Sequence, residues 1–216
     1  MTEHNFDHMR RAMIANLLRT TGTNDPRVLA AFGEVARERF MPEGKRALAY
    51  ADALVPLTSG RHLNNPMALG RLLTEADTRE GERALVVGAA TGYAAAILSR
   101  LVGPVTAVEQ DPELAAFARE ALSGYDVELI EGPLVQGHPA AGPYDLIFID
   151  GAVEFVPDAV VEQLRDGGRV ATGIVDRGVT RLALGRRAGE GFGTASFTDA
   201  ATAILPSFVR PKTFTF

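Results

Sequence analysis

The chain has 216 residues, which is enough for one large α/β domain with a sizeable core. Its formal net charge is −5 and it has no run of Lys and Arg, so the sequence argues against a nucleic-acid partner, which would leave a basic stripe. The absence of cysteine excludes disulfides, thiolate metal sites and cysteine nucleophiles, and it suits a reducing cytoplasm.

The first 80 residues predict a helical cap with a substrate-side loop. The N-terminus is polar, without the apolar core of a signal peptide, and no stretch of the chain approaches the ~18 apolar residues of a membrane span. We therefore expect a cytoplasmic protein with no membrane partner. Helical spacing, capping residues and loop-forming residues predict the following segments: helices over 6–20, from Pro26 and over 66–73, and irregular structure over 42–65.

From Arg83 onward, short apolar runs alternate with helical patterns. The expected strands are 84–88, 105–109, 127–131 and 144–150, and the expected helices are 93–101, 112–122 and 157–164. This alternation is typical of βαβ units and a parallel sheet covered on both faces. Further extended segments at 169–175, 180–187 and 194–216 suggest a terminal antiparallel hairpin. We predict an α/β fold with a mostly parallel, doubly wound, Rossmann-like sheet over 81–216, in one structural domain with the cap.

Two features of this sheet point to an adenosine-containing cofactor. The first strand runs into the small-residue loop Gly88-Ala89-Ala90-Thr91-Gly92, and the second strand ends at Glu109, about 20 residues on. An acid there can accept hydrogen bonds from both hydroxyls of a ribose. The alternative is that the loop serves only packing and Glu109 is a solvated strand end. Because the loop lacks the G-x-G-x-x-G that brings backbone N–H groups onto a pyrophosphate, NAD is the weaker candidate, whereas S-adenosylmethionine carries no phosphate.

Several stretches resemble one known family. DPRVLAAFGEVARERFMPEGKRALAYADALVPL (25–57) resembles the "D-x-R-V-L…V-x-R-x-x-F-V-P…A-Y-x-D-x-x-L-P" pattern of the protein-L-isoaspartate O-methyltransferases, and GAATGYAAAIL (88–98) resembles their "G-T-G-S-G-Y-x-A-A-x-L" loop. Val108-Glu109 and LRDGGRV (164–170) are similar to further family stretches. The resemblance implies a Rossmann-like methyltransferase that uses S-adenosylmethionine to methylate a carboxylate of a damaged protein or peptide.

The resemblance also implies the site residues. GRHLNNP (60–66) stands where the family has "G-Q-T-I-S-Q-P", so His62 stands at the Thr, Asn64 at the Ser thought to act at the substrate, and Asn65 at the Gln. The expected catalytic or substrate-side residues are Asn64 and His62, from this alignment, and Asp150, from its position at the end of the fourth strand. The expected cofactor-binding residues are Gly88, Ala89, Ala90, Gly92, Glu109 and Asn65.

Some of these residues have plainer interpretations. Asp150 at the end of the fourth strand could orient a substrate amine or act as a base, or it could simply cap the next turn. His62 could face the substrate or be solvated, and His138 lies in a Gly- and Pro-rich turn that suggests a structural role. The histidines and carboxylates lack the spacing of metal ligands, so we expect no metal.

The sequence departs from the family at the rim of the expected site. Val86 replaces the acid before the glycine loop, Pro133 stands at the acid of the family's "G-D-G" turn, and Asn64 replaces the serine. Two alternatives therefore remain: methylation of another, small substrate, and a catalytically silent relative that acts as a binding module. Methyl transfer to an ionised carboxylate needs little acid–base help, so loss of the serine argues against the usual substrate geometry more than against methyl transfer.

Overall fold

The computed structural model describes residues 3–210, so the end of the segment expected to be extended over 194–216 lies outside the described part. Helix α1 (Glu3–Met13) continues into a π-turn (Ile14–Leu18), and α2 (Pro26–Glu34) follows. Asp25 caps α2, because its side chain accepts a hydrogen bond from the backbone N–H of Arg27 at 2.7 Å. The buried face of α2 carries Val28, Leu29 and Phe32. The first two predicted helices are confirmed.

The stretch expected to be irregular contains a small hairpin. Two 3₁₀ turns (Arg37–Phe40 and Glu43–Leu48) precede β1 (Val55–Pro56), which pairs antiparallel with β2 (His62–Leu63). The prediction of wholly irregular structure over 42–65 was therefore wrong in this detail, since strands of two residues carry no readable periodicity. The hairpin leads into α3 (Pro66–Glu75), whose N-cap Asn65 accepts a hydrogen bond from the N–H of Ala68 at 2.8 Å.

A seven-stranded sheet forms the centre of the molecule, in the order β5-β4-β3-β6-β7-β8-β9. Its strands are β3 (Ala84–Val87), β4 (Val105–Glu109), β5 (Val127–Glu131), β6 (Tyr144–Val153), β7 (Leu164–Asp176), β8 (Val179–Ala188) and β9 (Gly191–Asp199). The first five in this order are parallel, and β8 and β9 are antiparallel additions. The predicted fold class, with its C-terminal antiparallel hairpin, is confirmed.

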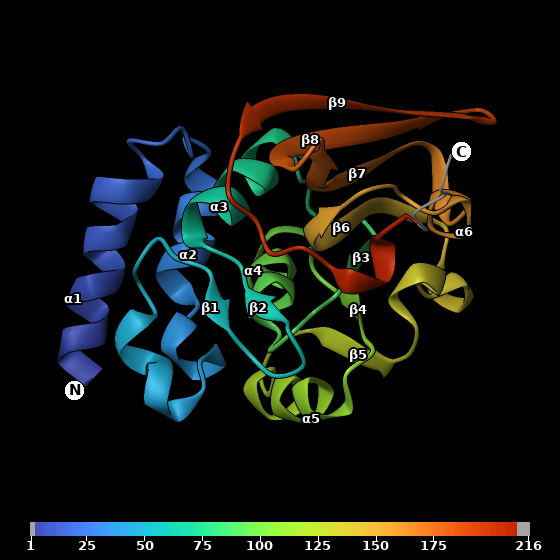
Figure 1. Cartoon of the computed structure of the whole chain (residues 1–216). Helices are drawn as coiled ribbons and strands as arrows, with labels where there is room; N and C mark the ends of the chain where they lie inside the picture. Colours follow the sequence, from blue (N-terminus) through green and yellow to red (C-terminus); the bar gives the residue numbers. More distant parts are fainter. Residues whose placement is uncertain (1–2, 211–216) are drawn as a thin grey trace.

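The two faces of the sheet are covered unequally. One face packs against α3, α4 (Tyr93–Val102) and α5 (Pro112–Ala121), and α2 packs on α3 and α4; these helices share one large apolar core (Figure 1). The other is covered by 3₁₀ turns, by α6 (Asp158–Val161) and by the chain after β9. The helix expected over 157–164 is reduced to four residues because β7 already begins at Leu164.

The chain after β9 crosses the carboxyl ends of the central strands, and we call residues 200–208 the strap. In Figure 1 it is the red segment that descends from β9 toward β6 and β3. The N–H of Ala152 donates to the carbonyl of Ala203 at 2.6 Å, and the N–H of Leu205 donates to the carbonyl of Ala152 at 2.9 Å. The strap therefore closes over the edge where open α/β sheets bind ligands.

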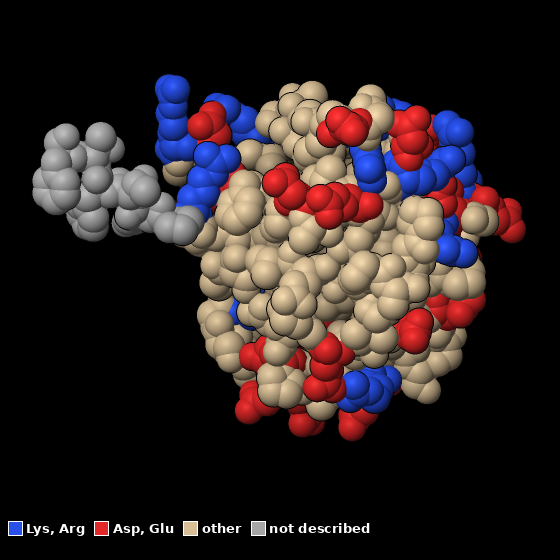
Figure 2. Space-filling model, turned by 90° about the vertical axis from the view of Figure 1, so that its right-hand side faces the viewer, with Lys and Arg blue, Asp and Glu red and all other residues tan. Residues whose placement is uncertain are grey.

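The surface carries charges of both signs. Figure 2 shows acidic and basic side chains distributed around the rim of one face, with a largely uncharged centre among the residues described there. In the described part of the chain, every helix is too short or too polar to span a lipid bilayer.

Candidate active site

The carboxyl ends of β3, β4 and β6 meet at one edge of the sheet, because Val87 lies in register with both Val108 and Ile149. The loop after β3 turns sharply into α4, with positive φ angles at Gly88 (81°), Ala90 (51°) and Gly92 (97°). A glycine is needed at the last of these, since a Cβ there would lie 2.9 Å from the side chain of Leu122.

Glu109, at the end of β4, faces this loop from a fully buried position. Its Oε2 accepts a hydrogen bond from the N–H of Ala90 at 2.7 Å, and its Oε1 accepts from the N–H groups of Gln110 and Asp111 at 2.9 and 3.0 Å. The interpretation of Glu109 as a solvated strand end was therefore wrong. The carboxylate joins the loop after β3 to the turn that starts α5.

A fourth donor to Glu109 comes from the cap. The buried side chain of Arg61 donates from Nη1 to Glu109 Oε1 at 2.6 Å and from Nη2 to the carbonyl of Gly88 at 3.2 Å. Leu205 of the strap lies on the same spot, since a Cβ on Gly88 would be 3.2 Å from its Cδ1 and 3.4 Å from Arg61 Nη2. Two side chains of the protein itself thus fill the space beside the loop and the acid.

Asn64 and Asp150 form a second buried contact at this edge. Asn64 donates from Nδ2 to Asp150 Oδ1 at 2.6 Å, while its Oδ1 accepts from the N–H of Ala203 at 2.7 Å. Burial raises the pKa of Asp150 to about 6, against the opposing effects of the hydrogen bond from Asn64 and the positive charges of Arg61 and Arg37. The cap, the sheet and the strap are joined by this pair.

Arg37 is a further residue of the site that the sequence analysis did not single out. Its guanidinium lies 4.6 Å from the ring centre of Tyr93 and donates from Nη2 to the carbonyl of Asn64 at 2.5 Å. Burial lowers the pKa of Arg37, and its Nε and Nη1 have no hydrogen-bond partner among the described residues. The signal was present, because Arg37 is the arginine of the "V-x-R-x-x-F" pattern.

The other predicted residues are less central. His62 is half-buried in β2, and Asn65 caps α3 and donates from Nδ2 to the carbonyl of Ala201 at 2.8 Å. Asn65 is thus engaged by the strap and its own helix, and a role at the cofactor stays a prediction. The structure brings the predicted residues Gly88, Ala89, Ala90, Gly92, Glu109, Asn64 and Asp150 together at this edge.

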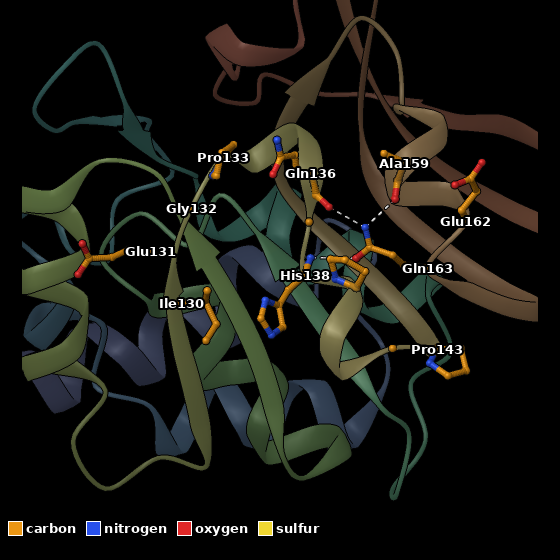
Figure 3. A pocket seen from close by; sticks show the side chains of 13 residues that line it. Ile130, Glu131, Gly132, Pro133, Gln136, His138, Pro143, Ala159, Glu162 and Gln163 are labelled. Carbon is orange, nitrogen blue, oxygen red and sulfur yellow. Dashed lines mark hydrogen bonds between the residues drawn. The ribbon is translucent and has the colours of Figure 1, made fainter.

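A separate cavity of about 810 Å³ lies beyond the end of β5. Pro133, His138 and Gln163 are among its lining residues (Figure 3). Gln163 accepts a hydrogen bond from the N–H of His138 at 2.9 Å and donates to the carbonyl of Gln136 at 2.7 Å. These bonds fix the main chain around the cavity. Within residues 3–210, no group of three His, Cys, Asp or Glu side chains could hold a metal ion.

The residues at the β3–β4 edge have the chemistry to bind an adenosine, but in this conformation other side chains occupy the space. Glu109 has the chemistry to hold ribose hydroxyls, and the small residues of the loop would allow close approach of a methionine moiety. Arg61 is instead the partner of Glu109, and Leu205 covers Gly88. S-adenosylmethionine fits the chemistry of these residues only if Arg61 and Leu205 move.

Comparison with known proteins gives the family. The sequence model of the family described as protein-L-isoaspartate(D-aspartate) O-methyltransferase matches residues 8–199. The chain is 41% identical over 164 residues to protein-L-isoaspartate O-methyltransferase 2 of an Anaeromyxobacter species, covering 74% of this chain and 68% of that protein. It is 37% identical over 194 residues to the protein-L-isoaspartate O-methyltransferase of Methylorubrum populi, covering 88% of this chain and 92% of that protein.

Solved structures share the fold. One protein-L-isoaspartate O-methyltransferase superposes with a TM-score of 0.80 at 24% identity, covering 91% of this chain, while the chain spans 65% of the length of that structure. A putative protein-L-isoaspartate O-methyltransferase from Plasmodium falciparum, solved with S-adenosyl-L-homocysteine, has a TM-score of 0.76 at 19% identity, covering 92% of this chain and 98% of that one. On its sequence match over residues 8–199, the chain belongs to the protein-L-isoaspartate(D-aspartate) O-methyltransferase family.

Proposed function

We propose that this chain transfers a methyl group from S-adenosylmethionine to a carboxylate of a protein or peptide. Family membership gives the reaction class, which is S-adenosylmethionine-dependent O-methyl transfer. The observation that carries the proposal is the buried carboxylate of Glu109, which faces the small-residue loop Gly88–Gly92 at the carboxyl edge of the sheet.

Each residue at the edge then has a proposed task. Glu109 would accept hydrogen bonds from the ribose hydroxyls, and the loop from Gly88 to Gly92 would lie alongside the methionine moiety. The bound cofactor supplies an electrophilic methyl group, and the acceptor carboxylate is already ionised at neutral pH. The chain's own residues therefore have to place that carboxylate in line and exclude water, rather than move a proton.

Asn64, Asp150 and His62 are the proposed substrate-side residues. Asn64 stands where the family has a serine, and its amide is held between Asp150 and the N–H of Ala203. Asp150, with its pKa raised to about 6, would orient an amide or amine of the substrate. Arg37 donates a hydrogen bond to the backbone carbonyl of Asn64 and acts as a positioning residue.

The proposed acceptor is an isoaspartyl or other carboxylate of a damaged protein or peptide. The names of the relatives from Anaeromyxobacter and Methylorubrum populi specify protein L-isoaspartate. The proposed location is the cytoplasm, in keeping with a chain that has no cysteine.

Calorimetry and methyl transfer test the function together. We expect the purified protein to bind S-adenosylhomocysteine and not NAD, because the loop has no cradle for a pyrophosphate. With radiolabelled S-adenosylmethionine and aged protein as acceptor, we expect label that is released by mild base, as a carboxyl methyl ester requires. Tight binding of NAD, or label that resists base, would contradict the proposal.

A second candidate function is a catalytically silent relative that serves as a binding module. The ion pair between Arg61 and Glu109 favours it, since the acid is occupied by the chain itself. This candidate, a cofactor-binding relative without catalysis, predicts that no acceptor is methylated, whereas a methyltransferase for another small substrate predicts labelling of a small molecule without labelling of protein.

A further inference from the structure

We infer that Arg61 and Leu205 hold the cofactor edge in a closed form, and that the adenosine of S-adenosylmethionine binds only after Arg61 has left Glu109. The inference rests on the proposed function for the nature of the ligand. It concerns residues outside the expected site, because Arg61 lies in the β1–β2 hairpin and Leu205 in the strap.

The hydrogen bonds of Glu109 make Arg61 the exchangeable partner. A carboxylate has about four acceptor positions, and Glu109 receives four hydrogen bonds. Three come from the backbone N–H groups of Ala90, Gln110 and Asp111, which are fixed by the loop and by the start of α5. The fourth comes from the side chain of Arg61. Three of these bonds, including that of Arg61, reach Oε1 and one reaches Oε2, so the limit on access is burial: the carboxylate has no exposed surface. A ribose can reach it without unfolding the loop by displacing Arg61, because the other three donors belong to the backbone of the loop and of the turn before α5.

Apart from its bond to Glu109, the guanidinium of Arg61 is only weakly held. Its Nη2 reaches the carbonyl of Gly88 at 3.2 Å, and its buried Nε has no partner among residues 3–210. The turn that carries it is exposed at its tip, with Ser59 and Gly60 at φ angles of 52° and 72°. A short turn at the surface can swing the guanidinium out of the edge with little disturbance of the sheet.

Leu205 completes the closure beside Arg61, over the loop after β3. Its side chain lies against both Gly88 and Gly151, where a Cβ would be 3.2 Å and 2.6 Å away respectively. The strap is fixed there by the backbone of Ala152 and by the side chain of Asn64. Its neighbour Ile204 is 49% exposed, so the strap is a single layer with solvent on its outer side.

A closed form lowers the measured affinity for the cofactor. When only a fraction of the molecules is open, the apparent dissociation constant rises by the inverse of that fraction. Removing the guanidinium should therefore tighten binding, even though it also removes a contact of Glu109. Glutamine is the suitable replacement, because the family pattern "G-Q-T" has it at the position of Arg61.

The test is calorimetric titration of S-adenosylhomocysteine into the wild-type protein, Arg61→Gln and Leu205→Ala. We expect Arg61→Gln to lower the dissociation constant by about tenfold or more, and Leu205→Ala to lower it by a smaller factor. Arg79→Gln is the matched control, because it removes an exposed ion pair with Asp77 at 2.7 Å, in the turn that precedes the amino end of β3. The control should bind as the wild type does.

The outcomes separate the closure from the proposed function. Equal, measurable affinity of all four proteins would overturn the closure and leave the methyltransferase intact. No binding by any of them would overturn both. If circular dichroism shows that Arg61→Gln is unfolded, Leu205→Ala decides: tighter binding supports the closure, and wild-type or weaker binding overturns it.

Discussion

Ala90 is the strained residue of the loop that faces Glu109. It has a φ of 51°, in the left-handed region that costs a residue with a Cβ roughly 1–2 kcal/mol, and the family pattern "G-T-G-S-G-Y" has glycine there. We predict that Ala90→Gly raises the free energy of unfolding by about 1 kcal/mol, as measured by urea denaturation. Ala89→Gly is the control, since Ala89 lies outside the left-handed region and glycine there should only destabilise. A loss of stability in Ala90→Gly would contradict the strain.

Asp150 should give the protein an unusual pH dependence. Its pKa rises from 3.8 to about 6 on folding, mainly through burial, so the folded state binds the proton more tightly. Stability from this group is present below pH 4 and is lost as the pH rises toward 6. Two pKa units correspond to roughly 3 kcal/mol. We therefore predict that Asp150→Asn removes a fall of this order in the free energy of unfolding between pH 4 and 6.

The measurement is urea denaturation of both proteins across that pH range. Exposed Asp126 supplies the control, because Asp126→Asn should show the same fall in the free energy of unfolding between pH 4 and 6 as the wild type. If Asp150→Asn also showed this fall, the carboxyl of Asp150 would not be the titrating group.

Individual site residues were predictable only where chain order determines them. Glu109 follows from the position of an acid at the end of the second core strand, and Asp150 from the end of the fourth. Arg61 did not follow, because nothing in its neighbourhood in the sequence shows that an arginine in a polar loop is buried against Glu109.

Arg61 and Glu109 are 48 positions apart along the chain. The β1–β2 hairpin brings Arg61 to Glu109, and its two-residue strands leave no periodic pattern in the sequence. Arg37 differs, since the family pattern contained it.

At the scale of the elements, the turn from β3 into α4 depends on Gly92. Its φ is 97°, and a Cβ would lie 2.9 Å from Leu122, which follows α5. We predict that Gly92→Ala lowers the free energy of unfolding by about 2–4 kcal/mol, from backbone strain and overpacking together.

Gly124 is the matched control for this variant. It has a similar φ of 89°, but nothing lies within 4 Å of its Cβ position. Gly124→Ala should therefore show the strain alone, about 1–2 kcal/mol. Equal losses in the two variants, measured by urea denaturation, would mean that the contact with Leu122 has no cost.

The core strands were predictable because buried parallel strands are continuous apolar runs with loop residues at both ends. The structure confirms the strands predicted over 105–109 and 127–131 to the residue, and the strand predicted over 84–88 ends one residue earlier, at Val87. The strap was not predictable as a cover of the site, because its position depends on hydrogen bonds to Ala152 and Asn64, far away in the sequence.

For the whole molecule, the site is assembled from three distant parts of the chain. The cap supplies Arg61 and Asn64, the sheet supplies Glu109 and Asp150, and the strap supplies Leu205. The division into a cap over 1–80 and a core over 81–216 stays a prediction. Asn64 of the cap loop bonds to both Asp150 and the strap, so we expect a change at Asn64 to alter the position of the strap.

The contact between the cap loop and the strap should also affect how the substrate is placed. We expect weak turnover of a standard isoaspartyl peptide, because Asn64 and His62 replace the smaller hydroxyl residues of the family, and a displacement of about 1 Å at the reacting carboxylate can cost about 100-fold in rate. His62→Thr combined with Asn64→Ser should raise turnover, since the serine gives up the hydrogen bonds to Asp150 and to the N–H of Ala203 and loosens the strap.

His138→Thr, in the cavity beyond β5, is the control and should leave turnover unchanged. The assay is radiolabelled methyl transfer to the isoaspartyl peptide and to its aspartyl counterpart. Robust, isoaspartyl-selective turnover by the wild-type protein would show that the amide of Asn64 serves the reaction as well as the serine does.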